Sequence, residues 1–415
     1  MRLIQQAIVT LFLIMLLAPG FQRLTKLFPV VPLYGVENRP DRPRFRLAAW
    51  FDGSYQKRYE AAFNARIGFR GQLVRTYNQI LFSVFSRTAN RRGTAVLVGK
   101  NDWLYEKAYV EHYLRGGRAS AEDLDRNARE LRLLQDELER RGSALVLLIS
   151  PSKAEIYPEH LPPDALDLGR NPGAQTNYRR MRPLLAAHGV RCVDAHELFL
   201  SLKPEAPYPL FAAGGTHWNH YGAFLALRQV VRALQPALAP RPLPLPDLAA
   251  VRLRPPEGAD KDLALLLNLW RAPGLAAPTP YPLVAAPPSA SPRLNLLIVG
   301  DSFAFTLIDV LNQARLFDRL DLLYYNRRLF SFAGQDGPFD YGSLEGRPID
   351  ARRLDWAALL AGRDAVILET NEMFIQRAGW GFVRAALDAL LGPAIRAAHP
   401  TAAEPEPEPP SRPGF

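Results

Sequence analysis

The chain has 415 residues and 48% of them are hydrophobic, which excludes a wholly disordered protein and is enough for one large domain or two. Lys and Arg outnumber Asp and Glu by 51 to 41, which gives a formal net charge of +10. The basic residues are scattered, with only short clusters such as Arg91-Arg92 and Arg327-Arg328. Because neither a basic stripe nor a known binding motif accompanies the charge, we expect no nucleic-acid partner, whereas an anionic glycan or a membrane surface remains open. Cys192 is the only cysteine, which excludes an intrachain disulfide and a multi-cysteine metal site.

The N-terminal segment, residues 1–24, predicts an export signal that is retained as a membrane anchor. Residues 3–21 are almost entirely apolar and end without a convincing small-x-small cleavage site. At about 1.5 Å per residue this run can barely cross a hydrocarbon layer of ~30 Å, so a cleaved signal peptide is the alternative. Arg23 and Lys26 follow the span and blunt its charge asymmetry, so the outward orientation depends partly on the rest of the chain.

Residues 25–93 predict a connector followed by amphipathic helices. Proline is frequent from Phe28 to Trp50, which favours an extended chain. Apolar residues from Ser54 to Phe85 recur at helical spacing and predict one or two helices packed on the main domain.

Residues 94–395 predict an α/β domain with a largely parallel sheet, because apolar strands and amphipathic helices alternate along the chain. The expected strands are 94–98, 144–149, 190–193, 294–299, 320–325 and 365–368, and the expected helices are 121–141, 177–187, 221–234, a segment after 302, and 382–391. Residues 235–290 are rich in proline and alanine and predict an insertion or surface excursion with one helical piece near 260–270. The Glu-Pro alternation within residues 396–415 predicts a disordered tail.

The strongest chemical signal is Gly300-Asp301-Ser302, which follows an apolar strand and precedes a helix. This order places Ser302 at the carboxyl edge of a parallel sheet, where α/β folds bind ligands. Gly300 permits the tight turn, and the backbone N–H of Ser302 at the helix start is a candidate oxyanion donor. The alternative is an ordinary serine at a helix N-cap.

A second signal is the glycine-flanked loop from Gly214 to Gly222, which contains His217 and Trp218. A serine nucleophile needs a base within hydrogen-bond reach, and His217 is the candidate. His220 is less persuasive because it is expected to cap the following helix or face solvent. No carboxylate or cysteine nearby completes a metal-ligand set with these histidines, so we expect neither a metal ion nor a cofactor.

A third signal is Asn371, which follows the apolar run from Ala365 to Leu368. Its side-chain N–H is a candidate oxyanion donor, and a loop asparagine after a strand is the alternative. Trp103, Trp218, Tyr324, Tyr325 and Trp380 are candidates to stack on sugar rings, and the alternative for each is a place in the core.

Together these motifs resemble the SGNH-hydrolase superfamily, whose nucleophile block is Gly-Asp-Ser after a strand. The order of histidine before serine resembles alginate O-acetyltransferases of the AlgJ and AlgX type. Further similar motifs are Phe63-Asn64 with Gly68-Phe69-Arg70, the run from Val98 to Tyr105, and the run from Pro151 to Pro158 with Leu161-Pro162. The resemblance covers most of residues 37–391 and implies a three-layer α/β domain, with Asn371 as the oxyanion asparagine.

One position departs from this family, whose acetyltransferases typically carry Asp two residues before the histidine. Gly215 stands there in this chain. Three outcomes follow: another acid such as Glu369 or Glu372 orients His217, the pair works as a dyad, or the site is degraded.

Three functions remain open from the sequence. The leading hypothesis is O-acetyl transfer to a secreted or cell-surface polysaccharide through an acyl-enzyme on Ser302. A carbohydrate esterase would use the same groups with water as the acceptor, and a non-catalytic glycan-binding or assembly subunit would explain Gly215. The resemblance further implies a membrane partner of the MBOAT type that exports acetyl equivalents, and a single-pass protein of the inner membrane with its main domain in the periplasm.

Overall fold

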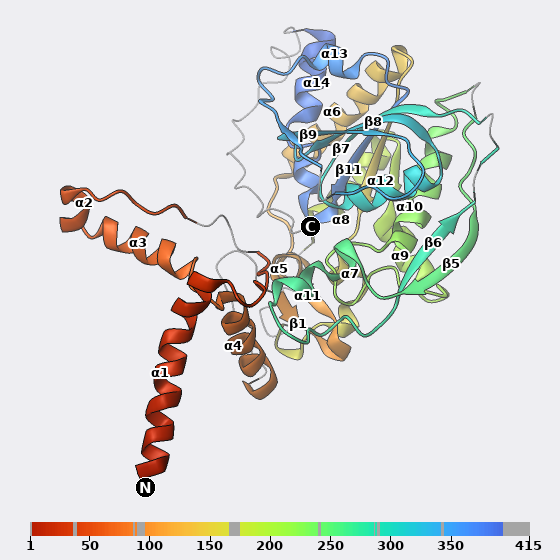
Figure 1. Ribbon diagram of the computed structural model, residues 1–415. Coiled ribbons are helices and arrows are strands. Elements are labelled where there is room, and N and C mark those ends of the chain that lie inside the picture. Colours follow the sequence, from red (N-terminus) through yellow and green to blue (C-terminus); the bar gives the residue numbers. More distant parts are fainter. Residues whose placement is uncertain are drawn as a thin grey trace. The chain divides into compact units, whose positions relative to one another are not determined.

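The computed structural model describes residues 2–35, 40–85, 88, 96–165, 175–239, 242–285, 287–288, 291–341 and 344–392 (Figure 1). The chain forms two compact units: the first contains residues 1–94 and 264–272, and the second contains 95–263 and 273–413. The tail expected to be disordered, residues 396–415, lies outside the described residues.

The first unit begins with the apolar helix α1, Arg2–Thr25, which is long and apolar enough to cross a membrane. Its length and composition suit a membrane anchor or a signal sequence equally. Three further helices follow in this unit: α2 (Leu47–Phe51), α3 (Ser54–Asn64) and α4 (Arg70–Phe85). The helical spacing of residues 54–85 therefore corresponds to two helices.

A short segment from the proline-rich region belongs to this first unit. Asn78 of α4 donates through Nδ2 to the carbonyl oxygen of Leu267 at 3.0 Å. Asn268 exchanges two hydrogen bonds with the backbone of Tyr34, at 2.9 and 3.0 Å. Residues 264–272 are therefore a structural part of the N-terminal unit rather than a surface excursion.

The second unit is built on a seven-stranded sheet in the order β10-β9-β8-β7-β11-β3-β4. Five strands are parallel: β3 (Ala144–Ser150), β4 (Cys192–Asp194), β7 (Leu294–Gly300), β8 (Phe317–Tyr324) and β11 (Ala365–Asn371). Two antiparallel strands complete one edge: β9 (Arg328–Ala333) and β10 (Arg347–Pro348). The mainly parallel sheet confirms the predicted fold class.

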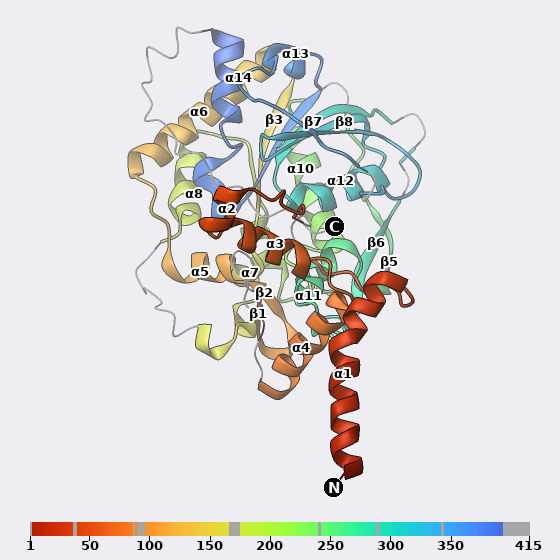
Figure 2. The ribbon, with the colours of Figure 1, turned by 60° about the vertical axis from the view of Figure 1, so that its left-hand side comes forward.

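Helices cover both faces of this sheet and make three layers (Figures 1 and 2). One face carries α6 (Ala121–Arg140), α8 (Asn177–Ala187), α13 (Trp356–Leu360) and α14 (Phe382–Leu391). The other carries α9 (Ala195–Leu202), α10 (His220–Leu234) and α12 (Phe303–Gln313). Every residue of β3 is buried, with Val146 packed toward the second group of helices and Leu145 toward the first, as expected for a parallel strand covered on both faces.

Smaller elements surround this core. Two antiparallel pairs are β1 (Val96–Val98) with β2 (Leu104–Glu106), and β5 (Leu248–Arg254) with β6 (Thr279–Val284). Short helices are α5 (Lys107–Arg115), α7 (Lys153–Ile156) and α11 (Asp262–Leu266). Residues 235–290 therefore carry a hairpin and a helix, and α11 begins with a carboxylate that the site uses.

Candidate active site

Ser302 and His217 form the centre of the site. Strand β7 ends at Gly300, and Ser302 immediately precedes α12. Oγ of the half-buried Ser302 lies 2.7 Å from Nε2 of the buried His217. This distance allows direct proton transfer from the hydroxyl to the imidazole, provided that the proton of the neutral ring is on Nδ1.

The acid beside His217 is Asp262, the first residue of α11. Its Oδ2 atom lies 3.1 Å from Nδ1 of His217. The two groups form an ion pair when the ring is protonated, but the contact does not have hydrogen-bond geometry. Its Oδ1 atom accepts a hydrogen bond from the backbone N–H of Thr216 at 2.8 Å. Asp262 therefore holds both the loop and the ring of the histidine, and it favours the tautomer with the proton on Nδ1.

Gly215 allows the segment that leads to Asp262 to approach the histidine loop closely. A Cβ atom at this position would lie 2.4 Å from the carbonyl oxygen of Ala259 and 2.9 Å from Cα of Asp260. The segment that delivers Asp262 thus occupies the space of any side chain at 215. The outcome in which another acid takes over is the one that the geometry supports.

Glu369 and Glu372, the acids expected for this task, lie elsewhere. Glu369 accepts from Ser150 Oγ at 2.6 Å and from the backbone N–H of Asp301 at 3.0 Å. Glu372 accepts from the backbone N–H of Ser152 and contacts Nδ1 of His196. The expectation that one of them orients His217 is therefore wrong, because both are committed to other partners.

Asp301 fixes the turn that presents the nucleophile. Its carboxylate accepts from the backbone N–H of Phe303 at 2.9 Å and from that of Asn371 at 3.0 Å, so it joins the start of α12 to the end of β11. Gly300 allows Glu369 to approach, since a Cβ there would lie 2.8 Å from Glu369 Oε2. Burial raises the pKa of Asp301 and of Glu369, and the proximity of the two carboxyls raises that of Glu369 further.

Asn371 is placed as an oxyanion donor would be. Strands β7 and β11 are parallel neighbours with Val299 opposite Leu368, so Asn371 ends β11 at the level of Ser302. Its Oδ1 atom accepts from the backbone N–H of Met373 at 3.1 Å, which orients the amide. Its buried Nδ2 atom has no hydrogen-bond partner among the described residues. A buried, oriented and unsatisfied N–H is available for a charge that develops during a reaction.

The surroundings of His217 stabilise its charged form. Burial lowers its pKa, but the contact with Asp262 and the charges of Asp262, Asp301 and Glu106 outweigh burial and raise the pKa above the usual 6.5. Burial raises the pKa of Glu106 as well. The site is thus suited to hold an imidazolium, the state that follows proton transfer from the serine.

Tyr325 is a further residue at the nucleophile. It has a positive φ of 49°, and its backbone N–H donates to the carbonyl oxygen of Gly300 at 2.9 Å. Burial raises the pKa of its hydroxyl, and a hydrogen bond with Ser302 opposes this shift. The ring packs edge-on against Trp380, with 4.9 Å between the ring centroids.

Lys153 holds the loop that carries His217 through hydrogen bonds to its backbone. Its Nζ atom donates to the carbonyl oxygens of Ala212 at 3.0 Å and Ala213 at 3.1 Å, and to that of Gly215. Burial lowers its pKa to about 7. It also lies 5.5 Å from the ring centre of Trp103, so two of the motifs noted in the sequence meet beneath the loop.

Trp218 and His220, two further residues noted in the sequence, have structural roles. Trp218 is fully buried and donates through Nε1 to the carbonyl oxygen of Phe303 at 3.2 Å, which ties the histidine loop to α12. The expectation that His220 caps a helix or faces solvent is wrong, because Asn219 is the N-cap of α10 and Nε2 of the partly buried His220 lies 3.2 Å from Asp309 Oδ2.

Residues 96–301 match the family model described as an SGNH hydrolase-like domain of the acetyltransferase AlgX. This part of the chain, just under half of its length, is similar to that family. The chain is 28% identical over 148 residues to the probable alginate O-acetylase AlgJ of Pseudomonas syringae pv. tomato. The aligned residues are 35% of this chain and 34% of that protein. It is 31% identical over 129 residues to the probable alginate O-acetylase AlgJ of Pseudomonas aeruginosa. Here the aligned residues are 31% of this chain and 30% of that protein. The aligned part is thus about a third of the length of these curated relatives.

Solved structures of similar proteins include the O-acetyltransferase domain of Pseudomonas putida AlgJ, at 20% identity and a TM-score of 0.41, over 68% of this chain and 92% of that one. Pseudomonas aeruginosa AlgX is 15% identical, with a TM-score of 0.43, over 74% of this chain and 71% of that one. Bacillus cereus PatB1 is 10% identical, with a TM-score of 0.45, over 70% of this chain and all of that one.

Sequence reasoning identified the serine, the histidine and the asparagine but missed Asp262, Lys153 and the contact of Tyr325 with Ser302. Asp262 lies in a region of proline-rich composition, where no local pattern indicates chemistry. Lys153 had a usable signal, because it comes shortly after a fully buried strand, and a lysine that is buried there is costly unless its ammonium group has partners.

Proposed function

We propose that this protein is an O-acetyltransferase that modifies a secreted or cell-surface polysaccharide through an acetyl-enzyme on Ser302. The observation that supports the proposal most strongly is the arrangement of Ser302, His217 and Asp262, with the unsatisfied Nδ2 of Asn371 at the same edge of the sheet. The relatives are named as alginate O-acetylases, which makes an acidic polysaccharide such as alginate the first acceptor to test.

In the first half-reaction Ser302 Oγ attacks the carbonyl carbon of an acetyl donor while its proton passes to Nε2 of His217. Asp262 stabilises the imidazolium. The backbone N–H of Ser302 and Nδ2 of Asn371 bind the oxyanion of the tetrahedral intermediate. The proton then passes from His217 to the leaving group, which departs and leaves acetyl-Ser302.

In the second half-reaction a sugar hydroxyl loses its proton to His217 and attacks the acetyl carbonyl. Collapse of the second intermediate returns the proton to Ser302 and releases the acetylated sugar. Water in place of the sugar would give net ester hydrolysis, so the access of acceptor and water to this centre decides between transferase and esterase.

Asp262 removes the main argument for a non-catalytic subunit, which was the glycine at position 215. A scaffold has no need for a buried carboxylate at 3.1 Å from the ring of a histidine that contacts a serine.

The proposal extends to location and partner. Helix α1 would anchor the chain in the inner membrane through residues 3–21, with the main domain in the periplasm. Free acetyl-CoA is confined to the cytoplasm, so the donor would come from a membrane-bound acetyl exporter of the MBOAT type.

The test is intact-mass spectrometry of the full-length protein in detergent after incubation with p-nitrophenyl acetate. We expect one acetyl adduct, or rapid release of p-nitrophenol, in the wild type and neither in Ser302→Ala. Ser201→Ala, at an exposed site, is the matched control and should behave as the wild type. Equal signals from wild type and Ser302→Ala would reject the acyl-enzyme. Addition of alginate oligosaccharides then distinguishes transfer from hydrolysis.

A further inference from the structure

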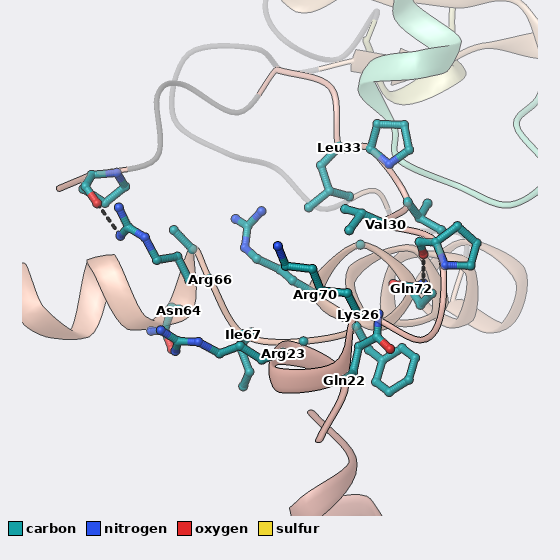
Figure 3. Close-up of a pocket in the computed structure, with 18 of the residues that line it drawn as sticks. Gln22, Arg23, Lys26, Val30, Leu33, Asn64, Arg66, Ile67, Arg70 and Gln72 are labelled. Atoms are coloured by element: carbon teal, nitrogen blue, oxygen red, sulfur yellow. Dashed lines mark hydrogen bonds between the residues drawn. The ribbon is translucent and has the colours of Figure 1, made fainter. Parts of the chain in front are cut away.

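The N-terminal unit contains a cavity of about 620 Å³ that no step of the proposed reaction uses (Figure 3). Its walls are the end of α1, the extended residues 29–33, and the turn between α3 and α4. All of these segments belong to one compact unit. The volume lies in the range of small-molecule sites.

The lining of this cavity is strongly basic. Arg23, Lys26, Arg66 and Arg70 supply four cationic side chains, and none of the described residues that line it is Asp or Glu. Lys26 and Arg70 extend in the same direction in Figure 3. Arg66 also forms an ion pair of 3.9 Å with the fully exposed Asp41. Four cations around one cavity create a site for an anion.

The cavity is built by the motif Gly68-Phe69-Arg70, which the catalytic site leaves unexplained. A Cβ at Gly68 would lie 2.2 Å from the carbonyl oxygen of Pro19, so only glycine allows the end of α1 to pack here. The same argument holds at Gly71, where a Cβ would lie 2.0 Å from the carbonyl oxygen of Val31. The sequence thus keeps two glycines in order to hold the walls of a charged cavity together.

The polar groups of the walls are fixed by hydrogen bonds. Gln22 donates to the carbonyl oxygen of Phe28 at 2.7 Å and accepts from its N–H at 3.0 Å. Gln72 donates to the carbonyl oxygen of Pro29 at 3.0 Å. Arg66 donates to the carbonyl oxygen of Pro40 at 2.6 Å, which holds its guanidinium at the cavity. This cavity is therefore preorganised.

Its position in the chain indicates the source of the anion. Arg23 lies in the last turn of α1, and Lys26 is the first residue after the helix. A helix that spans a membrane places its last turn and the residues after it at the level of the lipid headgroups. Basic groups at that level attract anionic lipids, by about 1 kcal/mol for each Lys or Arg near the surface.

We propose that this cavity binds the phosphate of an anionic phospholipid headgroup, such as that of phosphatidylglycerol, at the membrane surface where α1 ends. The bound phosphate faces the basic side chains of the cavity and fixes the turn between α3 and α4 to the bilayer. The site is separate from Ser302 and does not depend on the proposed acetyl transfer.

The test is native mass spectrometry of the full-length protein released from detergent after titration with dioleoyl phosphatidylglycerol or dioleoyl phosphatidylcholine. We expect the wild type to retain phosphatidylglycerol at least tenfold better than phosphatidylcholine. Arg23→Gln with Lys26→Gln should lower retention of phosphatidylglycerol by about tenfold or more. The control Lys57→Gln with Arg58→Gln removes the same charge from exposed positions of α3 and should leave retention unchanged.

A second variant keeps all charges. Ala65→Trp places a large ring in the cavity and should lower retention as the double variant does. Equal retention of the two lipids by the wild type, or equal loss in the cavity and control double variants, would overturn the proposal. Displacement of the lipid by millimolar inorganic phosphate would also overturn it, since the site would then recognise a free anion.

Discussion

A Cβ atom on Gly215 would lie 2.4 Å from the carbonyl oxygen of Ala259. The loop at Gly215 and the segment of residues 259–262, which are far apart in the chain, therefore pack in direct contact. The second segment places Asp262 beside His217. A side chain at position 215, where the resemblance leads us to expect the acid, would occupy the space of the segment that leads to Asp262.

Gly215→Asp should consequently fail to restore the family pattern. The new side chain must displace the backbone at Ala259 and Asp260, so we expect a loss of folding stability of about 3 kcal/mol and a loss of esterase activity of at least 10²-fold. Chemical denaturation and initial rates with p-nitrophenyl acetate measure both. Ser201→Asp adds the same carboxylate at an exposed site and should change neither. Full activity of Gly215→Asp combined with Asp262→Ala would contradict this account.

The fold was largely readable from the sequence because its central strands are mainly apolar runs. Strands β3 and β11 are buried along their whole length and β7 is buried except at Asn295, and polar residues at or just after the end of each strand lie at one edge of the sheet. Ser302 and Asn371 follow directly from this pattern, because the polar residue after a buried strand is placed by the strand itself.

The acid could not be found in the same way. Asp262 owes its place to the path of residues 235–290, whose proline-rich composition predicts only an irregular excursion. Its distance from His217 depends on the close approach at Gly215, which is a property of tertiary packing and leaves no local pattern. Tyr325 was noted only as an aromatic residue, because a positive φ cannot be read from the composition around it.

Asp262→Asn should lower kcat by roughly 10³- to 10⁴-fold, by analogy with the loss of the orienting acid in serine proteases. The pH profile provides a second readout. His217 acts as a base only when neutral, so activity rises as the pH passes through its pKa, which Asp262 raises above 6.5. Removal of that charge should move the acid limb of the profile to lower pH while the plateau falls.

Rate measurements from pH 4.5 to 9 with wild type, Asp262→Asn and the exposed control Asp247→Asn test this prediction. An acid limb that stays in place or moves to higher pH in Asp262→Asn would show that another group sets the pKa of His217.

Asn371→Ala should separate catalysis from stability. The variant removes an Nδ2 that has no partner among the described residues and one acceptor for the N–H of Met373, so the stability loss should be limited to about 1 kcal/mol. We expect kcat to fall by roughly 10²- to 10³-fold, as for loss of one oxyanion donor, with little change in KM.

Asn295→Ala is the matched control for this position. Asn295 lies at the other end of β7, where its side chain donates to the carbonyl oxygen of Gly362 at 2.8 Å. This variant should lose comparable stability and keep full activity. An unchanged kcat in Asn371→Ala would mean that the oxyanion relies on other donors.

Tyr325→Phe should reduce kcat/KM by about tenfold and leave folding stability unchanged. Ser302 lowers the pKa of this hydroxyl, which places the hydroxyl beside the nucleophile whose Oγ atom contacts His217. The ring itself keeps its packing against Trp380. Tyr324→Phe is the control, because that neighbouring ring is buried in the core and Ser302 is not among the groups that shift the pKa of its hydroxyl. If the hydroxyl orients Ser302 for attack, the loss should be in kcat and should appear equally in acetyl-enzyme formation measured in a single turnover. A loss confined to KM would instead assign Tyr325 to the binding of the acetyl donor, because removal of a contact made equally in ground and transition states changes only affinity.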